Sequence, residues 1–138
     1  VFKLGPSNVQ AWQPFVPQHN GGVQDLFAMQ AQLAQAQSPL VAGWQAADVL
    51  AEVMLIEGFA LDADVRQQPI FAHNTVWLVQ SEACAHHLFV CLDPSLHSHS
   101  IDEAAHSLRS ADVWICLDSA LSDQAKLRLS DVCKVRVI

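Results

Sequence analysis

The fold of this chain is indicated by a segment that occurs twice towards its C-terminal end. The first copy is Phe89-Val90-Cys91-Leu92-Asp93-Pro94-Ser95-Leu96, and the second, 25 residues later, is Trp114-Ile115-Cys116-Leu117-Asp118-Ser119-Ala120-Leu121. In each copy an apolar run ends in Cys-Leu-Asp, and a polar stretch and a helical pattern follow. This order is typical of consecutive strand–loop–helix units, so we predict a small parallel sheet in this half of the chain. Such a sheet places polar residues at its carboxyl edge, where ligands usually bind.

Hydrophobic periodicity predicts the other elements. Two helices come first, over about 23–37 and 45–57, with apolar residues at the i, i+3, i+4, i+7 spacing. After Asp62 the period changes, and apolar runs predict strands at 65–67, 70–72, 75–79, 88–92, 113–117 and 135–138. Ser100 and Glu103 form a capping box for a helix from Ile101 to about Leu108, and Ser122 or Asp123 caps a helix to about Val132.

Together these elements define an α/β fold. It consists of two N-terminal helices, a β-hairpin and a βαβαβ unit that forms a small mixed, mostly parallel sheet with helices packed on it. We expect a single domain over 1–138, with an entry strand and loop at 1–22, a helical pair at 23–60 and the sheet unit at 64–138. The helix at 45–57 is apolar over more than half its circumference, which predicts burial on two sides. Because the chain starts at Val1 rather than Met, we also expect a fragment of a longer protein.

Composition restricts the possible partners. Hydrophobic residues make up 51% of the 138 residues and charged residues only 15%, against about a quarter in typical domains. A surface so poor in charge predicts that another domain or subunit covers part of it. The formal net charge is −7, and only seven Lys and Arg residues exist, which argues against direct DNA or RNA binding.

Cysteine usage and hydropathy predict the compartment. The four cysteines form no CxxC pair, which fits a reduced, cytoplasmic, bacterial-type intracellular protein. The chain contains no run of 18 apolar residues and opens with no signal peptide pattern, so we expect no membrane segment.

Two aspartates at the predicted sheet edge are the first site candidates. Asp93 and Asp118 are residue types that ligate Mg²⁺ or carry out acid–base chemistry. However, no Gly-rich loop follows either strand, and no lysine stands at a spacing that suits phosphoryl transfer. Asp-Pro and Asp-Ser after a strand are also ordinary turn and cap chemistry, and this structural interpretation is the one we favour.

Histidines and a loop tryptophan are the remaining candidates. His97 and His99, together with His86, His87, Cys84 and His106, are the best metal candidates in the chain, but they lack the spacing of known zinc sites. Surface loop histidines are therefore the simpler interpretation. Trp12 lies in a loop punctuated by Pro and Gly, which makes it a candidate interface anchor.

Three stretches together resemble one protein family. Near the start stands Val1-Phe2-Lys3-Leu4-Gly5-Pro6-Ser7-Asn8-Val9-Gln10-Ala11-Trp12. The second is Asp48-Val49-Leu50-Ala51-Glu52-Val53-Met54-Leu55-Ile56-Glu57-Gly58-Phe59-Ala60-Leu61, and the third is Val113-Trp114-Ile115-Cys116-Leu117-Asp118-Ser119-Ala120-Leu121-Ser122-Asp123, with Lys126-Leu127. In order and spacing they are similar to the C-terminal region of modification (Mod) subunits of type III restriction-modification systems.

The resemblance implies a role without catalysis for this piece. Members of that family are site-specific adenine-N6 DNA methyltransferases that use S-adenosylmethionine, with an Asp-Pro-Pro-Tyr motif and a Gly-containing cofactor loop. Neither occurs in this chain, which has no tyrosine, so no catalytic, cofactor-binding or metal residue carries over. The implied role is assembly with a second Mod subunit or with the restriction (helicase–nuclease) subunit. S-adenosylmethionine and DNA would be bound by the rest of the parent protein.

A second hypothesis stays open at this point. The chain could be a free-standing small α/β domain with a metal or phosphate ligand at Asp93 and Asp118. The first hypothesis predicts an apolar surface patch and self-association, whereas the second predicts Mg²⁺ affinity that depends on the two aspartates.

Overall fold

A computed structural model describes residues 5–11, 13–16, 22–36 and 39–138. The predicted entry strand at 1–4 and the candidate anchor Trp12 lie outside these residues. The chain divides into two compact units, residues 1–44 and 45–138, and each is treated separately below. The division falls between the two N-terminal helices, so that the second helix belongs with the sheet.

The first unit contains helix α1 (Val23–Ala36), which agrees with the predicted range as far as the described residues extend. The helix is rich in Ala and Gln, both good helix formers, and has no Gly or Pro. It starts where the Gly22 carbonyl accepts the N–H groups of Asp25 and Leu26 at 3.0 and 3.3 Å.

The chain on either side of α1 is joined by a short antiparallel contact. Val9 and Leu40 form a bridge. Next to it, the Gln10 N–H donates to the Pro39 carbonyl at 2.7 Å, and the Val41 N–H donates to the Asn8 carbonyl at 2.9 Å. This contact holds together the two segments from which α1 emerges.

The second unit is built on a five-stranded mixed sheet in the order β1-β2-β3-β4-β5. Its strands are β1 (Asp64–Gln67), β2 (Val76–Gln80), β3 (Leu88–Cys91), β4 (Val113–Cys116) and β5 (Lys134–Val137). Strands β1, β2 and β3 pair antiparallel, whereas β3, β4 and β5 pair parallel. The predicted α/β fold with a mixed sheet is therefore confirmed, and its parallel part is the half that contains the repeated segment.

The two copies of the repeat form neighbouring strands in register. Leu88 pairs with Val113, Phe89 with Trp114, Val90 with Ile115 and Cys91 with Cys116, so every pair is separated by the same 25 residues as the repeat. The similar side chains of the two copies consequently stand beside one another on the same face of the sheet.

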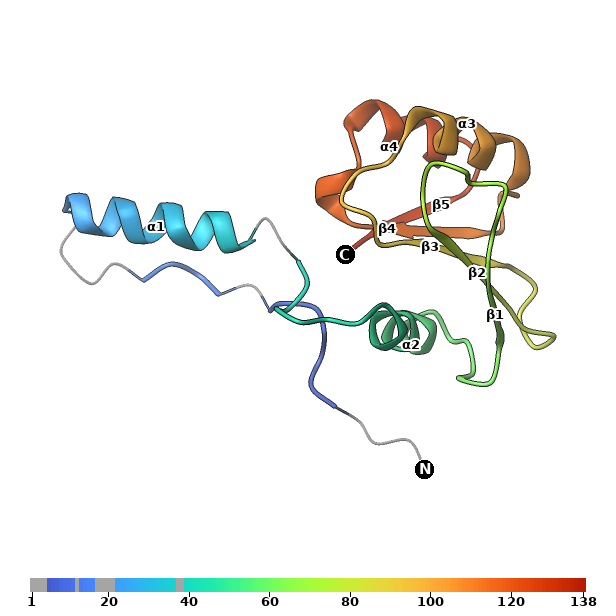
Figure 1. The fold of residues 1–138 in the computed structure, drawn as a ribbon, viewed down its shortest axis with the longest axis horizontal. Coiled ribbons are helices and arrows are strands. Elements are labelled where there is room, and N and C mark those ends of the chain that lie inside the picture. Colours follow the sequence, from blue (N-terminus) through green and yellow to red (C-terminus); the bar gives the residue numbers. More distant parts are fainter. Residues whose placement is uncertain (1–4, 12, 17–21, 37–38) are drawn as a thin grey trace. The chain divides into compact units, whose positions relative to one another are not determined.

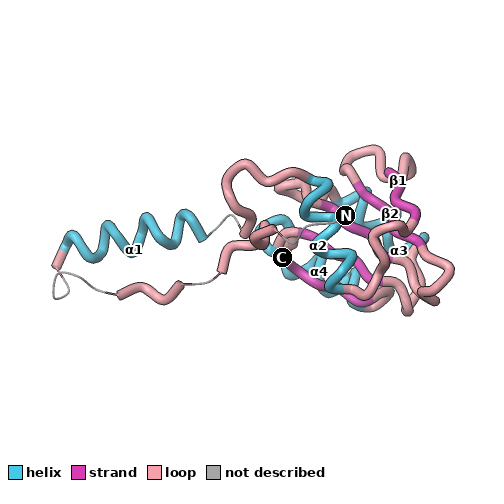
Figure 2. The backbone as a smooth tube through the Cα atoms, turned by 90° about the horizontal axis from the view of Figure 1, so that it is seen from below, coloured by secondary structure: helices cyan, strands magenta, loops and turns pink. Residues whose placement is uncertain are grey.

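Helices cover both faces of this sheet. Helix α2 (Ala46–Ile56) lies on one face, and helices α3 (Ser98–Ser107) and α4 (Asp123–Ser130) lie on the other (Figures 1 and 2). Strands β3 and β4 are buried at all four positions each. A strand covered on both faces needs apolar residues at successive positions rather than at alternate ones, which explains the unbroken apolar runs in the sequence.

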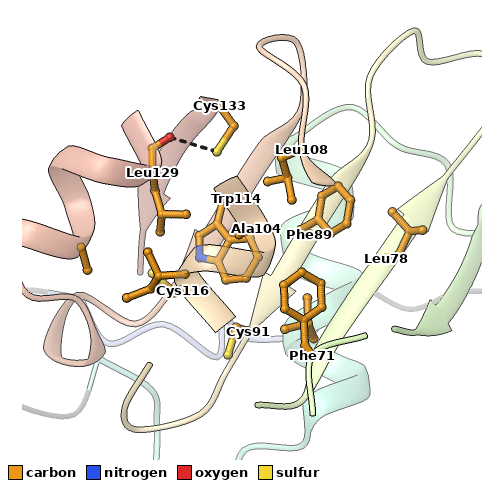
Figure 3. Packing of buried hydrophobic residues seen from close by; sticks show 13 residues of the cluster. Phe71, Leu78, Phe89, Cys91, Ala104, Leu108, Trp114, Cys116, Leu129 and Cys133 are labelled. Atoms are coloured by element: carbon orange, nitrogen blue, oxygen red, sulfur yellow. Dashed lines mark hydrogen bonds between the residues drawn. The ribbon is translucent and has the colours of Figure 1, made fainter. Parts of the chain in front are cut away.

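The core between the sheet and α3 and α4 is organised around Trp114, which is completely buried. Its ring lies 5.7 Å from that of Phe71 and 6.4 Å from that of Phe89, between centroids. Leu129 of α4 and Leu108 after α3 close over it (Figure 3).

Three local predictions differ from the structure. Residues 70–72 form a turn rather than a strand, with the Phe71 N–H donating to the Gln68 carbonyl at 3.3 Å; Phe71 is apolar because it enters the Trp114 core. The capping box at Ser100 is wrong, because α3 already starts at Ser98 and Ser100 is buried within its first turn. Finally, the predicted burial of α2 on two sides is wrong. The helix buries Val49, Leu50, Val53 and Met54, whereas Leu55 and Ile56 are exposed.

Candidate functional site

Asp93, the first sheet-edge candidate, is engaged in a hydrogen-bond network. Its Oδ2 accepts the Thr75 N–H at 2.8 Å and the side-chain amide of Asn74 at 2.9 Å. The Asn74 amide nitrogen also donates to the Ser95 carbonyl at 2.8 Å, and its Oδ1 accepts the His97 N–H at 2.9 Å. This network fastens the turn before β2 to the loop after β3, so it is the turn chemistry that the sequence predicted as the structural interpretation.

Asp118 occupies the corresponding position after β4 but has a different environment. It is exposed and begins a short 3-10 helix, Asp118–Ala120. Its backbone N–H donates to the Ile138 carbonyl at 3.1 Å, which extends the pairing beyond β5. The two aspartates therefore have different surroundings and different local roles.

The predicted histidine group is split between the two ends of the sheet. His97 and His99, after β3, form a stack with His73, whose ring lies 4.3 Å from that of His97 and 5.4 Å from that of His99. His97 Nδ1 accepts the His99 N–H at 3.3 Å and thereby caps α3. Before β3, His86 instead packs edge-to-face on Phe59 at 5.2 Å. Within the described parts of the chain, no three His, Cys, Asp or Glu side chains are placed to hold a metal ion.

A buried carboxylate that sequence reasoning missed lies at the amino edge of the sheet. Asp112 is 1% exposed. Its Oδ1 accepts the His87 N–H and its Oδ2 the Arg109 N–H, both at 2.9 Å, and the Arg109 guanidinium lies within 3.4 Å. Its backbone carbonyl accepts the Lys134 N–H at 3.0 Å. Asp112 therefore connects the starts of β3, β4 and β5. In the sequence, the only signal of this role is that Asp112 stands directly before an apolar run.

These contacts lower the pKa of Asp112. Burial by itself would raise the pKa, but the backbone N–H groups of His87 and Arg109 and the nearby guanidinium together outweigh it. Arg109 also contacts His87 Nδ1 at 3.1 Å through Nη2.

The buried thiols are held in their protonated, unreactive form. Burial raises the pKa of Cys91 to about 12 and the pKa of both Cys116 and Cys133 to about 11. All four cysteines are free, and Cys84 is half-buried. A thiol nucleophile needs a lowered pKa, so these three cysteines contribute to packing rather than to chemistry.

The most unusual surface of the described chain is one side of α1. Val23, Leu26 and Phe27 are 66%, 61% and 65% exposed, and Leu33 is 47% exposed. Successive residues of a helix are about 100° apart, so these four residues share one side, which we call the α1 apolar row. Gln30 lies within the row.

The polar side of α1 faces the other segments of the first unit. Asp25 and Gln32 lie seven residues apart, opposite the row. Asp25 is 5% exposed, and the Gln32 amide donates to the Gln13 carbonyl at 2.6 Å. The segment 13–16 runs along the helix in both views (Figures 1 and 2). An ordinary surface helix buries its apolar side, whereas within the first unit the apolar side of α1 stays uncovered.

Comparison with models of known families, with curated proteins and with solved structures finds no significant match. None of the helices among the described residues is both long and apolar enough to cross a membrane.

Removing the carboxylate of Asp93 or of Asp118 should have unequal effects. Asp93→Ala leaves the Thr75 N–H and the Asn74 amide without their acceptor, and we expect it to lower the free energy of unfolding by about 1–3 kcal/mol. Asp118→Ala, the matched control, should change it by less than about 0.5 kcal/mol. Urea unfolding with and without MgCl₂ measures both. A Mg²⁺-dependent gain in stability that either variant abolishes would instead support a metal site.

The lowered pKa of Asp112 predicts how stability changes in acid. The pKa of Asp112 in the folded protein lies below the unfolded value of about 3.9. The contribution of Asp112 to the free energy of unfolding is therefore complete above the unfolded pKa, and it is lost as the pH falls through the folded pKa. Asp112→Asn should cost about 1–3 kcal/mol at pH 7, and the loss should shrink below about pH 4. Urea midpoints measured between pH 7 and pH 2 test this, with the exposed Asp62→Asn as control. A pH-independent difference between wild type and Asp112→Asn would contradict it.

Proposed function

We propose that this chain is the non-catalytic C-terminal assembly domain of a Mod subunit, the site-specific adenine-N6 DNA methyltransferase of type III restriction-modification systems. In this proposal the domain joins its subunit to a second Mod subunit or to the restriction subunit. Catalysis, S-adenosylmethionine binding and DNA recognition belong to the rest of the parent protein.

The observation that carries the proposal is the α1 apolar row. Four large apolar side chains on one side of a helix are exposed, while the polar side of that helix lies against other segments of the first unit. Large apolar side chains exposed together on one surface are typical of a protein–protein interaction site. Placing it in water costs free energy that a partner would recover, at roughly 25 cal/mol for each Å² of apolar surface covered.

The groups capable of chemistry support the same proposal. Asp93 and Asp112 accept hydrogen bonds from within the second unit, and the core thiols are buried and protonated. The net charge of −7 disfavours contact with phosphate backbones. The family itself is proposed from the resemblance of the segments at 1–12, 48–61 and 113–127.

The competing hypothesis of a ligand site at Asp93 and Asp118 receives less support. A carboxylate that accepts two hydrogen bonds and fastens two loops has a structural role that needs no ligand. Asp93 is in this position, and Asp118 is exposed on its own short helix.

The test is a substitution in the row, made in the complete subunit that contains this chain. Leu26→Glu should abolish assembly, measured as solution mass with and without the restriction subunit, and should leave S-adenosylmethionine binding unchanged. Ala28→Glu adds the same charge to an exposed position off the row and should assemble as wild type. Normal assembly of Leu26→Glu would contradict the proposal, and so would a parent protein that does not bind S-adenosylmethionine.

A further inference from the structure

We propose that His97 is a pH-dependent cap of helix α3, so that mild acid loosens the first turn of this helix. The uncharged ring of His97 closes the start of α3, and the protonated ring leaves it open. All groups involved lie in the second unit, so this behaviour is independent of the α1 apolar row and of the proposed function.

The cap is a hydrogen bond to a nitrogen that can take a proton. His97 Nδ1 accepts the His99 N–H at 3.3 Å, and the backbone of His97 is extended, as is usual for the residue that precedes a helix. The common capping residues Ser, Thr and Asn keep their acceptor oxygen at every pH, whereas a protonated imidazole has two N–H donors and no acceptor. Protonation of His97 therefore removes the cap.

Two neighbouring rings act in the same direction as the loss of the cap. The His97 ring lies 4.3 Å from that of His73 and 5.5 Å from that of His99, and the His73 and His99 rings are 5.4 Å apart, between centroids. All three residues are exposed, so each can exchange protons with water. Rings that stack while neutral repel one another when charged, and the partial positive charge at the start of a helix disfavours further cations there.

Two of the acids near the stack already have partners. Asp93 accepts hydrogen bonds from the turn before β2, and Asp102 of α3 pairs with Arg128 of α4 at 2.5 Å. Glu103 stands four residues after His99, the spacing at which side chains of a helix meet, so it is the acid that a charged His99 can contact. The pH response is therefore assigned to the cap nitrogen, and His99 contributes only as a neighbour in the stack.

The first turn of α3 is also weakly held on its buried side. Ser100 is completely buried, and its hydroxyl has no hydrogen-bond partner within the part of the chain that the structure describes. A buried polar group without a partner costs free energy. Release of this turn therefore recovers part of the free energy that the loss of the cap costs.

Bonds without a titrating atom limit how far the change extends. Asn74 Oδ1 accepts the His97 backbone N–H at 2.9 Å, and the Asn74 amide donates to the Ser95 carbonyl at 2.8 Å. These bonds involve no ring nitrogen, so they anchor the chain just before α3 whether the His97 ring is neutral or charged. The loosening is therefore confined to the first turn of the helix, and the sheet stays folded.

The opposite end of α3 provides a control of opposite sign. His106 stands in the last turn, and its Nδ1 lies 2.6 Å from the Asp102 carbonyl oxygen. A protonated ring donates to a carbonyl, and a positive charge is favoured near the C-terminal end of a helix. Acid should therefore strengthen this end of α3 while it weakens the other.

The test is amide hydrogen exchange of the 138-residue chain at about pH 7.5 and about pH 5, on either side of ordinary histidine titration. The Ile101 N–H donates to the His97 carbonyl at 3.2 Å and reports the first turn. After correction for intrinsic exchange, its protection in the wild type should fall about fivefold or more in acid, the factor that corresponds to a typical cap. The midpoint should match the titration of the His97 ring followed by NMR. His97→Asn keeps an acceptor that does not titrate and should show no such fall, whereas His106→Asn should keep it.

Equal protection of Ile101 at both pH values in the wild type would overturn the pH-dependent cap, and so would an undiminished fall in His97→Asn. Loss of the fall in His106→Asn would also overturn it, because the titrating group would then lie at the other end of the helix. His73→Ala provides a second measurement that leaves the cap bond in place. By removing one ring of the stack it should reduce the fall without abolishing it, and a fall equal to or larger than that of the wild type would contradict the role of the stack.

Discussion

The structure of the second unit depends on the complete burial of β3 and β4 between two layers of helices. Because both faces of these strands are covered, every side chain from Leu88 to Cys91 and from Val113 to Cys116 is apolar and buried. Polar groups are consequently displaced to the two ends of the strands. Asp112 joins the strand starts at one end, and Asp93 fastens two loops at the other. The residues that most resemble catalytic groups are therefore the residues that the buried strands need at their ends.

Much of this arrangement could be predicted from the sequence, because its signals are local. The repeated apolar runs predicted β3 and β4, and their constant 25-residue spacing corresponds to the strand register. Ser122 was one of two predicted caps, and its side chain does accept the Ala125 N–H at the start of α4. A residue that caps a helix acts within four positions of itself, so sequence alone contains the relevant information.

The features that could not be predicted depend on distant partners. Asp112 receives the N–H of His87, 25 residues earlier, and His73 joins the ring stack of His97 and His99 only through the fold. Phe71 was assigned to a strand because an apolar residue in a strand-like run has the same local pattern as one that enters a core from a turn. Ser100 was assigned as a cap because the pattern Ser-x-x-Glu recurs within helices as well as at their starts; here His97 caps the helix three residues earlier.

Helix α1 illustrates a different limit of sequence reasoning. Its apolar periodicity predicted the helix, and the same periodicity ordinarily predicts that its apolar side faces the core. Within the first unit, the structure instead buries Asp25, bonds Gln32 to Gln13 and leaves Val23, Leu26 and Phe27 exposed. Periodicity identifies which side of a helix is apolar but not which molecule covers it. The assembly proposal follows from this reversal.

Amide hydrogen exchange of the chain at low and high concentration tests this account most directly. We predict that amides of 23–36 exchange rapidly in the dilute chain and become protected as the concentration rises, because the uncovered helix gains a partner. Amides of β3 and β4 should be strongly protected at both concentrations. If α1 showed the same protection at every concentration, matching that of β3 and β4, its apolar row would already be covered within the single chain, and the central claim would be contradicted.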